Sequence, residues 1–124
     1  MKLFYFAGND KPLSAGLLDI IEACTPPESI FVHTSVNSLA ARLRRFYADS
    51  IMIVILTTTV EELMDIVAIK ELLQDLPILL ILPDNKKETI SKGTTLHPRF
   101  ISYLQDDFTE VESVMRKMVK RYSV

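Results

Sequence analysis

The stretch SIMIVILTTTVEE, residues 50–62, places six consecutive apolar residues directly before three threonines. An apolar run without polar alternation predicts a strand that is covered on both faces, as in the centre of a parallel sheet. A second run of this kind, ILLIL at 78–82, predicts a second central strand. The sequence around these two strands then determines what kind of sheet they belong to.

Three further strands are predicted on either side of these two, at 2–7, 29–34 and 99–104. The second and fifth strands are shorter or contain polar residues, which favours positions at the sheet edges. The segments between the strands carry apolar residues at helical spacing. These residues are Leu13, Leu17, Ile20, Ile21 and Cys24; Val36, Leu39, Leu43 and Phe46; and Phe108, Val111, Val114, Met115, Met118, Val119 and Tyr122.

Polar residues with capping geometry precede several of these helices. Ser35 is placed to cap the second helix. The spacing of a capping box occurs in Thr58 with Glu61, in Thr59 with Glu62 and in Thr109 with Glu112. The threonines after the third strand therefore have a structural explanation as the start of a helix.

Strands that alternate this regularly with helices predict a parallel sheet joined by right-handed crossovers. Five such units in residues 1–124 predict a single α/β domain, a three-layer α/β/α sandwich. The expected strand order is 2-1-3-4-5, as in flavodoxin-like folds.

The composition is that of a globular protein, with 48% hydrophobic and 24% charged residues. The net charge is −2, so neither nucleic acid nor an anionic membrane is expected as a partner, and Arg42, Arg44 and Arg45 are interpreted as a solvated face. No apolar run approaches the roughly 20 residues that span a bilayer. A cytoplasmic protein is the simplest interpretation, and Cys24 is interpreted as a small buried apolar residue.

The tail YLQDDF at 103–108 places Tyr103 in the last predicted strand and Phe108 shortly after it. With the chain length and the order of elements, it resembles the receiver domain of two-component response regulators over almost the whole chain. The resemblance implies a metal-binding acidic pair after the first strand and a phosphoacceptor aspartate after the third. It also implies a hydroxyl residue after the fourth strand, a lysine after the fifth, and a switch aromatic, which Tyr103 matches.

The residues at the catalytic positions of this pattern are unsuited to the chemistry. Ala7, Gly8, Asn9 and Asp10 stand in the acidic-pair region, Thr57 and Thr58 at the phosphoacceptor, Leu82 and Pro83 at the hydroxyl, and Asp106 at the lysine. Aspartyl phosphorylation needs a nucleophilic carboxylate, a metal and a fixed cation. We therefore expect a degenerate receiver, neither an enzyme nor a binder of metal or cofactor. It would signal or act as a scaffold through contacts with a protein such as a sensor kinase or an output protein.

The resemblance also indicates where a partner would bind. In receivers the fourth helix, fifth strand and fifth helix form the contact face, here carrying Tyr103, Arg116, Lys117, Lys120 and Arg121. Acidic residues at one end and basic residues at the other make this face electrostatically two-ended. Such a face favours a weak homodimer or a charged protein partner.

Other interpretations remain open from the sequence. Thr57–Thr59 could help a flavodoxin-like module to bind a small anion, such as phosphate, a nucleotide or a flavin, at the ends of the first and third strands. A displaced phosphoacceptor, Asp10 or Asp84, is a weaker alternative, and these two residues with Asp106 and Asp107 could form a low-affinity cation site. His33 and His97 are interpreted as ordinary strand-end residues.

Overall fold

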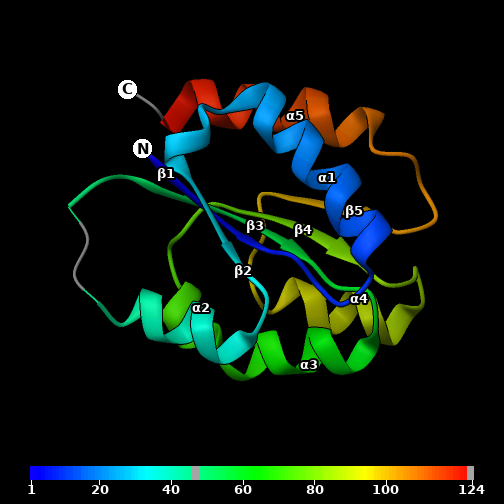
Figure 1. Cartoon of the computed structure of the whole chain (residues 1–124). Coiled ribbons are helices and arrows are strands. Elements are labelled where there is room, and N and C mark those ends of the chain that lie inside the picture. Colours follow the sequence, from blue (N-terminus) through cyan, green and yellow to red (C-terminus); the bar gives the residue numbers. More distant parts are fainter. Residues whose placement is uncertain (46–47, 123–124) are drawn as a thin grey trace.

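The predicted strands form one parallel sheet in the order β2-β1-β3-β4-β5 in the computed structural model, which describes residues 1–45 and 48–122 (Figure 1). The strands are β1 (Lys2–Phe6), β2 (Ile30–His33), β3 (Ile51–Leu56), β4 (Ile78–Leu82) and β5 (Phe100–Tyr103). The predicted flavodoxin-like fold and strand order are confirmed. β1, β2 and β5 are each slightly shorter than the sequence pattern predicted.

Helices cover both faces of the sheet (Figure 1). The helices are α1 (Lys11–Cys24), α2 (Val36–Leu43), α3 (Val60–Ala68), α4 (Lys87–Thr94) and α5 (Thr109–Tyr122), with 3₁₀ turns η1 (Pro27–Ser29) and η2 (Lys70–Leu73). α1 and α5 pack on one face, and α2, α3 and α4 pack on the other, which gives the three predicted layers. Within the described residues, no helix combines the length and the apolar character that crossing a bilayer requires.

The two central strands are buried along their whole length, as their uninterrupted apolar sequences predicted. Ile53 and Ile55 belong to the core beneath α2, α3 and α4. Leu79 and Ile81 belong to the opposite core, beneath α1 and α5. Successive residues of a strand point to opposite faces, so a strand covered on both sides has no position for a polar residue.

Two of the predicted helix caps are confirmed. Ser35 Oγ accepts a hydrogen bond from the backbone N–H of Ser38 at 3.1 Å, and α2 begins at the residue after Ser35. Thr59 Oγ1 accepts one from the N–H of Glu62 at 3.1 Å, and α3 begins at Val60. Of the two capping boxes proposed in the threonines, the pair Thr59 and Glu62 is therefore the one that caps α3.

The third predicted capping box is wrong. Thr109 is the first residue of α5 rather than the residue before it. Its N–H donates to the carboxylate of Asp107 at 3.1 Å, while Glu112 forms an ion pair with Arg116 at 3.5 Å. The spacing of Thr109 and Glu112 is compatible with a capping box, but Asp107, two residues before Thr109, supplies the acceptor. Phe46, predicted as the end of the α2 apolar stripe, lies outside the described residues.

Candidate functional site

The candidate site lies at the carboxyl end of the sheet, where β1 and β3 lead into the loops before α1 and α3. Its centre is the threonine triplet, in which each residue has a different role. Thr57 is fully buried, and its hydroxyl donates to the carbonyl oxygen of Ile81 at 2.7 Å. This bond joins the end of β3 to β4 and leaves the Thr57 hydroxyl facing the protein interior rather than solvent.

Thr58 is bound to a carboxylate from the first turn of α3. Glu62 Oε1 accepts from the Thr58 N–H at 2.7 Å and from the Thr58 hydroxyl at 2.5 Å. The Glu62 side chain is buried, with 7% of its surface exposed. A helix N-terminus attracts negative charge because its first N–H groups have no partner within the helix. At the N-terminus of α3, the carboxylate of Glu62 supplies this negative charge.

The β1–α1 loop closes over the same point. Gly8 has φ +70°, and a Cβ atom there would lie 2.8 Å from the Leu56 carbonyl oxygen and 3.3 Å from Thr58 Cγ2. Only glycine adopts this backbone conformation without strain and fits the space. The loop therefore packs directly against the end of β3, next to the Thr58–Glu62 pair.

The other residues of the predicted acidic-pair region have structural roles or face solvent. Ala7 is buried, and its N–H extends the pairing of β1 with β2 by donating to the His33 carbonyl at 3.0 Å. Asn9 is exposed. Asp10 caps α1, because its carboxylate accepts from the N–H of Leu13 at 3.2 Å.

The residues at the predicted hydroxyl position, Leu82 and Pro83, carry no hydroxyl group. Leu82 is buried in the core, and Pro83 leads into the next loop. Asp84 accepts from the Lys86 N–H at 2.9 Å. Its pKa is lowered, first by a hydrogen bond with Thr89 and then by the Lys86 N–H. Asp84 is thus the acceptor of a loop turn before α4.

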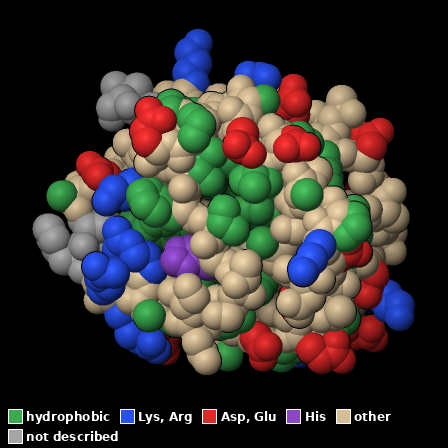
Figure 2. All heavy atoms as spheres, viewed as in Figure 1, with side chains coloured by type: hydrophobic (Ala, Val, Ile, Leu, Met, Phe, Trp, Pro, Cys, Tyr) green, Lys and Arg blue, Asp and Glu red, His purple; other side chains and the backbone are tan. Residues whose placement is uncertain are grey.

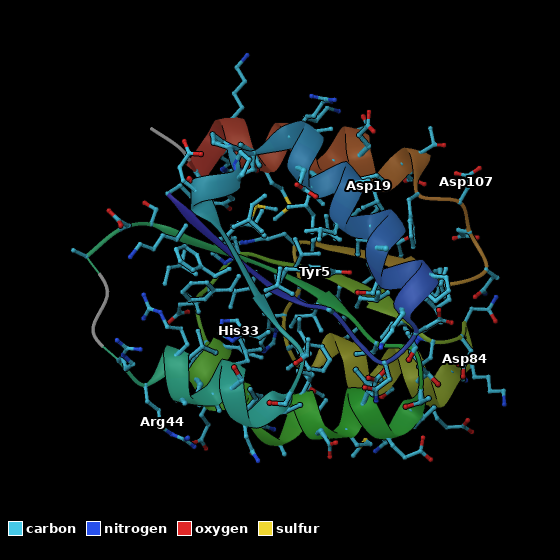
Figure 3. The ribbon with its side chains drawn as sticks, viewed as in Figure 1. Tyr5, Asp19, His33, Arg44, Asp84 and Asp107 are labelled. Carbon is cyan, nitrogen blue, oxygen red and sulfur yellow. The ribbon has the colours of Figure 1, made fainter. Side chains whose placement is uncertain are left out.

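The four aspartates at this end of the sheet lie on three loops, and Asp106 and Asp107 share the loop between β5 and α5. Figure 3 shows Asp84 and Asp107 apart from one another, both directed outward. Asp106 is exposed in the turn after β5, where its N–H donates to the Tyr103 carbonyl at 3.1 Å. No group of three or more acidic, histidine or cysteine side chains in the described parts of the chain is placed to share a metal ion. Asp10 and these three do not form the cation site considered from the sequence.

The predicted contact residues fall on more than one face. Tyr103 is half-buried against the core beneath α2, α3 and α4. Arg116 turns toward α1, where it donates to the Ala23 carbonyl at 3.4 Å. Lys117 and Arg121 are exposed and share a different face of α5, because residues four apart lie together on a helix.

Lys120 is also exposed on α5, between the two faces just described. The guanidinium group of Arg121 lies 5.7 Å from the centre of the Tyr122 ring. The part of the predicted surface that can meet a partner beside α4 and β5 is therefore the Lys117 and Arg121 side of α5, without Arg116.

The histidines and the cysteine show no catalytic pairing. His33 ends β2 as predicted, and its Nδ1 lies 2.8 Å from Ser38 Oγ. Burial, with a smaller contribution from Arg42, lowers its pKa. His97 is not a strand-end residue but lies in the α4–β5 loop with φ 52°. Burial raises the pKa of the Cys24 thiol, which is half-buried against the α1 and α5 core, in keeping with a packing role.

Glu62 is the site residue whose role the sequence did not predict. Its spacing indicated only a capping box with Thr59, although that spacing was a signal for its position in the first turn of α3. Comparison with protein-family models, with curated proteins and with solved structures finds no match to this chain. The resemblance to receiver domains therefore stays a prediction from the sequence.

Proposed function

We propose that this chain is a receiver-like module that acts through protein contacts and accepts no phosphoryl group. The observation that carries the proposal is the pairing of Glu62 with Thr58 at the end of β3. At this position the receiver pattern requires a carboxylate open to solvent. Here the strand-end side chain is a buried threonine, and the nearby carboxylate is buried and hydrogen-bonded by the chain itself.

The chemistry of phosphoryl transfer supports the same proposal. The attacking oxygen must reach the phosphorus in line with its leaving group, and the charge on the other oxygens must be neutralised. Asp10 is engaged as the cap of α1, and Asp106 stands where the pattern requires a cation. The residues at the receiver positions therefore supply neither an exposed carboxylate at the end of β3 nor a cation at the lysine position.

The alternative of a bound small anion has less support. An anion at the start of α3 would use the N–H and hydroxyl of Thr58, and both already donate to Glu62. A second anion placed there would also be repelled by the buried carboxylate, because charges interact strongly where water is excluded. Anion binding would require Glu62 to leave its site.

The surface through which the module would meet a partner has two candidates. One is the Lys117 and Arg121 side of α5, which favours a weak homodimer or an acidic partner. The other is the β2 edge, where Phe31 and Val32 are 38% and 46% exposed. Figure 2 shows exposed apolar side chains on the face that carries β2, bordered by basic side chains on one side and by acidic side chains above. We propose the α5 side as the contact, and the β2 edge is the competing outcome.

The phosphoryl part of the proposal is tested with acetyl phosphate and with beryllofluoride, each with magnesium. Intact-mass spectrometry should show no added phosphoryl group, and amide NMR spectra should not change with beryllofluoride. A phosphorylation-competent receiver serves as the positive control for the reagents. An acid-labile phosphoprotein would overturn the proposal.

The contact is tested by analytical ultracentrifugation at low salt. The double variant Lys117→Glu with Arg121→Glu should reduce self-association, because exposed charges are screened little under these conditions. A Val32→Glu variant is the matched comparison on the β2 edge and should leave self-association unchanged. If the dimer survives the α5 reversal and is lost in Val32→Glu, the contact lies at β2. A monomer at every concentration would exclude both dimers.

A further inference from the structure

A cavity opens at the end of the sheet opposite to the threonines. Its volume is about 630 Å³, within the range of small-molecule sites in proteins. One wall comes from η2 and the turn that leads into β4, and the other comes from the loop between α4 and β5. The charged residues and the imidazole of the two walls are Lys70, Glu71 and Asp75, and His97 and Arg99. No part of the proposed function depends on this cavity.

The two walls differ in charge. The η2 wall holds one lysine and two acidic residues, whereas the other wall holds Arg99 and the imidazole of His97. In the part of the chain that the structure describes, the ion pairs at 4 Å or less are Lys2 with Asp49 and Arg116 with Glu112. The charged groups of the cavity are therefore not paired with one another, although both signs line the same space.

The backbone of the cavity is held in an unusual conformation. Among the described residues, the non-glycine residues with positive φ are Asp75 at 66° and His97 at 52°, one in each wall. Left-handed backbone is uncommon outside glycine and tends to occur where the surrounding structure enforces it, often at ligand sites. Here the enforcing bonds include the His97 N–H to the Thr94 carbonyl at 3.0 Å and the Arg99 N–H to the Ile78 carbonyl at 2.8 Å.

Apolar side chains complete the lining. Leu96 is buried and Leu76 is half-buried, so the cavity has an apolar part beneath its charged residues. Most of the lining residues are polar or charged, so the cavity suits a charged ligand with a small apolar part. Backbone hydrogen bonds fix the two turns, and the charged side chains that the turns carry are exposed to solvent.

We propose that this cavity binds a small zwitterion of amino-acid or dipeptide size. The carboxylate of such a ligand would lie toward Arg99 and His97, because a guanidinium group pairs with a carboxylate in two parallel hydrogen bonds. Its ammonium group would lie toward Glu71 and Asp75. A ligand with only one charge would pair with one wall alone, so both charges of a zwitterion contribute to binding.

The experiment is a ¹H–¹⁵N NMR titration of the whole chain with the twenty common amino acids and with glycyl dipeptides. At least one should shift the amide signals of residues 70–76 and 95–99 together, in a saturable manner. Its N-acetyl and methyl-ester derivatives, which each lack one charge, should bind at least tenfold more weakly. Acetate and inorganic phosphate distinguish simple anion binding from recognition of a zwitterion.

The variants Asp75→Asn and Arg99→Gln should each weaken binding at least tenfold. Asparagine tolerates left-handed backbone as aspartate does, so Asp75→Asn removes the charge while keeping the turn. Lys92→Gln, an exposed change on α4 outside the cavity lining, is the control for net charge and should bind as the wild type does. The proposal is overturned if no amino acid or dipeptide shifts both walls at millimolar concentration, if the anions alone reproduce the shifts, or if both cavity variants bind normally.

Discussion

Replacing Thr57 tests whether the end of β3 retains a structural role without the receiver chemistry. Its hydroxyl donates to the Ile81 carbonyl at 2.7 Å, and its own backbone N–H donates to the same oxygen at 3.0 Å. Thr57→Val keeps the shape of the side chain and removes only the hydroxyl. The Ile81 carbonyl then keeps its backbone partner, so no buried acceptor is left without a hydrogen bond.

The expected loss in the free energy of unfolding for Thr57→Val is therefore about 0.5–1.5 kcal/mol, the net contribution of one hydrogen bond. Thr57→Asp, which restores the residue type of the receiver pattern, should behave very differently. It places a carboxylate at a fully buried position, facing a carbonyl oxygen that cannot donate to it. An uncompensated buried charge costs about 3–5 kcal/mol, so this variant should be much less stable than the valine variant.

Urea unfolding followed by far-ultraviolet circular dichroism measures both differences, provided that the denaturant dependence stays constant between variants. Thr94→Val is the matched control, because it removes an exposed hydroxyl that donates to the Ser91 carbonyl at 2.8 Å at the end of α4. It should change stability by less than about 0.5 kcal/mol. If Thr57→Asp is as stable as the wild type, the end of β3 is open to solvent and the interpretation of the site is wrong.

Three other predictions concern the core, the β1–α1 loop and a buried tyrosine. Ile53→Ala and Leu79→Ala, on opposite faces of the sheet, should each lower the free energy of unfolding by about 2–5 kcal/mol, and losses below about 1 kcal/mol in urea unfolding would contradict the central placement. Gly8→Ala should destabilise the protein by about 1–3 kcal/mol, because Gly8 has a positive φ and contacts the end of β3. Gly16→Ala, in open space on α1, should stabilise the protein by about 0.5–1 kcal/mol. Equal effects of the two variants would refute the close approach of Gly8 to β3. Burial raises the pKa of Tyr5 from 10.0 to about 12, so the unfolded chain loses the tyrosine proton at a lower pH than the folded chain does. The free energy of unfolding should therefore fall between about pH 10 and 12. Unfolding curves of Tyr5→Phe should show a smaller loss over this pH range.

Much of the fold could be predicted because buried strands have a recognisable apolar sequence pattern. The runs at 51–56 and 78–82 contain no polar residue, and this pattern is typical of strands covered on both faces. The cap at Thr59 was predictable for a similar reason, since capping depends on residues only three apart. Local patterns of this kind are read from the sequence without knowing what lies across the fold.

The candidate site was less predictable because its contacts join segments that are distant in sequence or allow several local choices. The pairing of Glu62 with Thr58 uses the same glutamate that the capping box assigned to Thr59, and spacing alone does not fix which residue the carboxylate reaches. The close approach of Gly8 to β3 depends on how two loops meet. The cavity beside Asp75 and His97 depends on two turns with left-handed backbone, and no sequence motif predicts these turns.

The exposed pair on the β2 edge has a consequence for the behaviour of the protein in concentrated solution. An edge strand with open hydrogen-bonding groups and apolar side chains can pair with the edge of another molecule and start aggregation. Here the Lys2 ammonium lies 5.7 Å from the centre of the Phe31 ring, and Arg42 lies 5.0 Å from that of Phe4 beside it. Lys2 also forms an ion pair with Asp49 at 3.6 Å, so charged groups stand next to the exposed strand. A second sheet edge that approaches β2 would have to desolvate these groups, so they keep this edge from recruiting further strands.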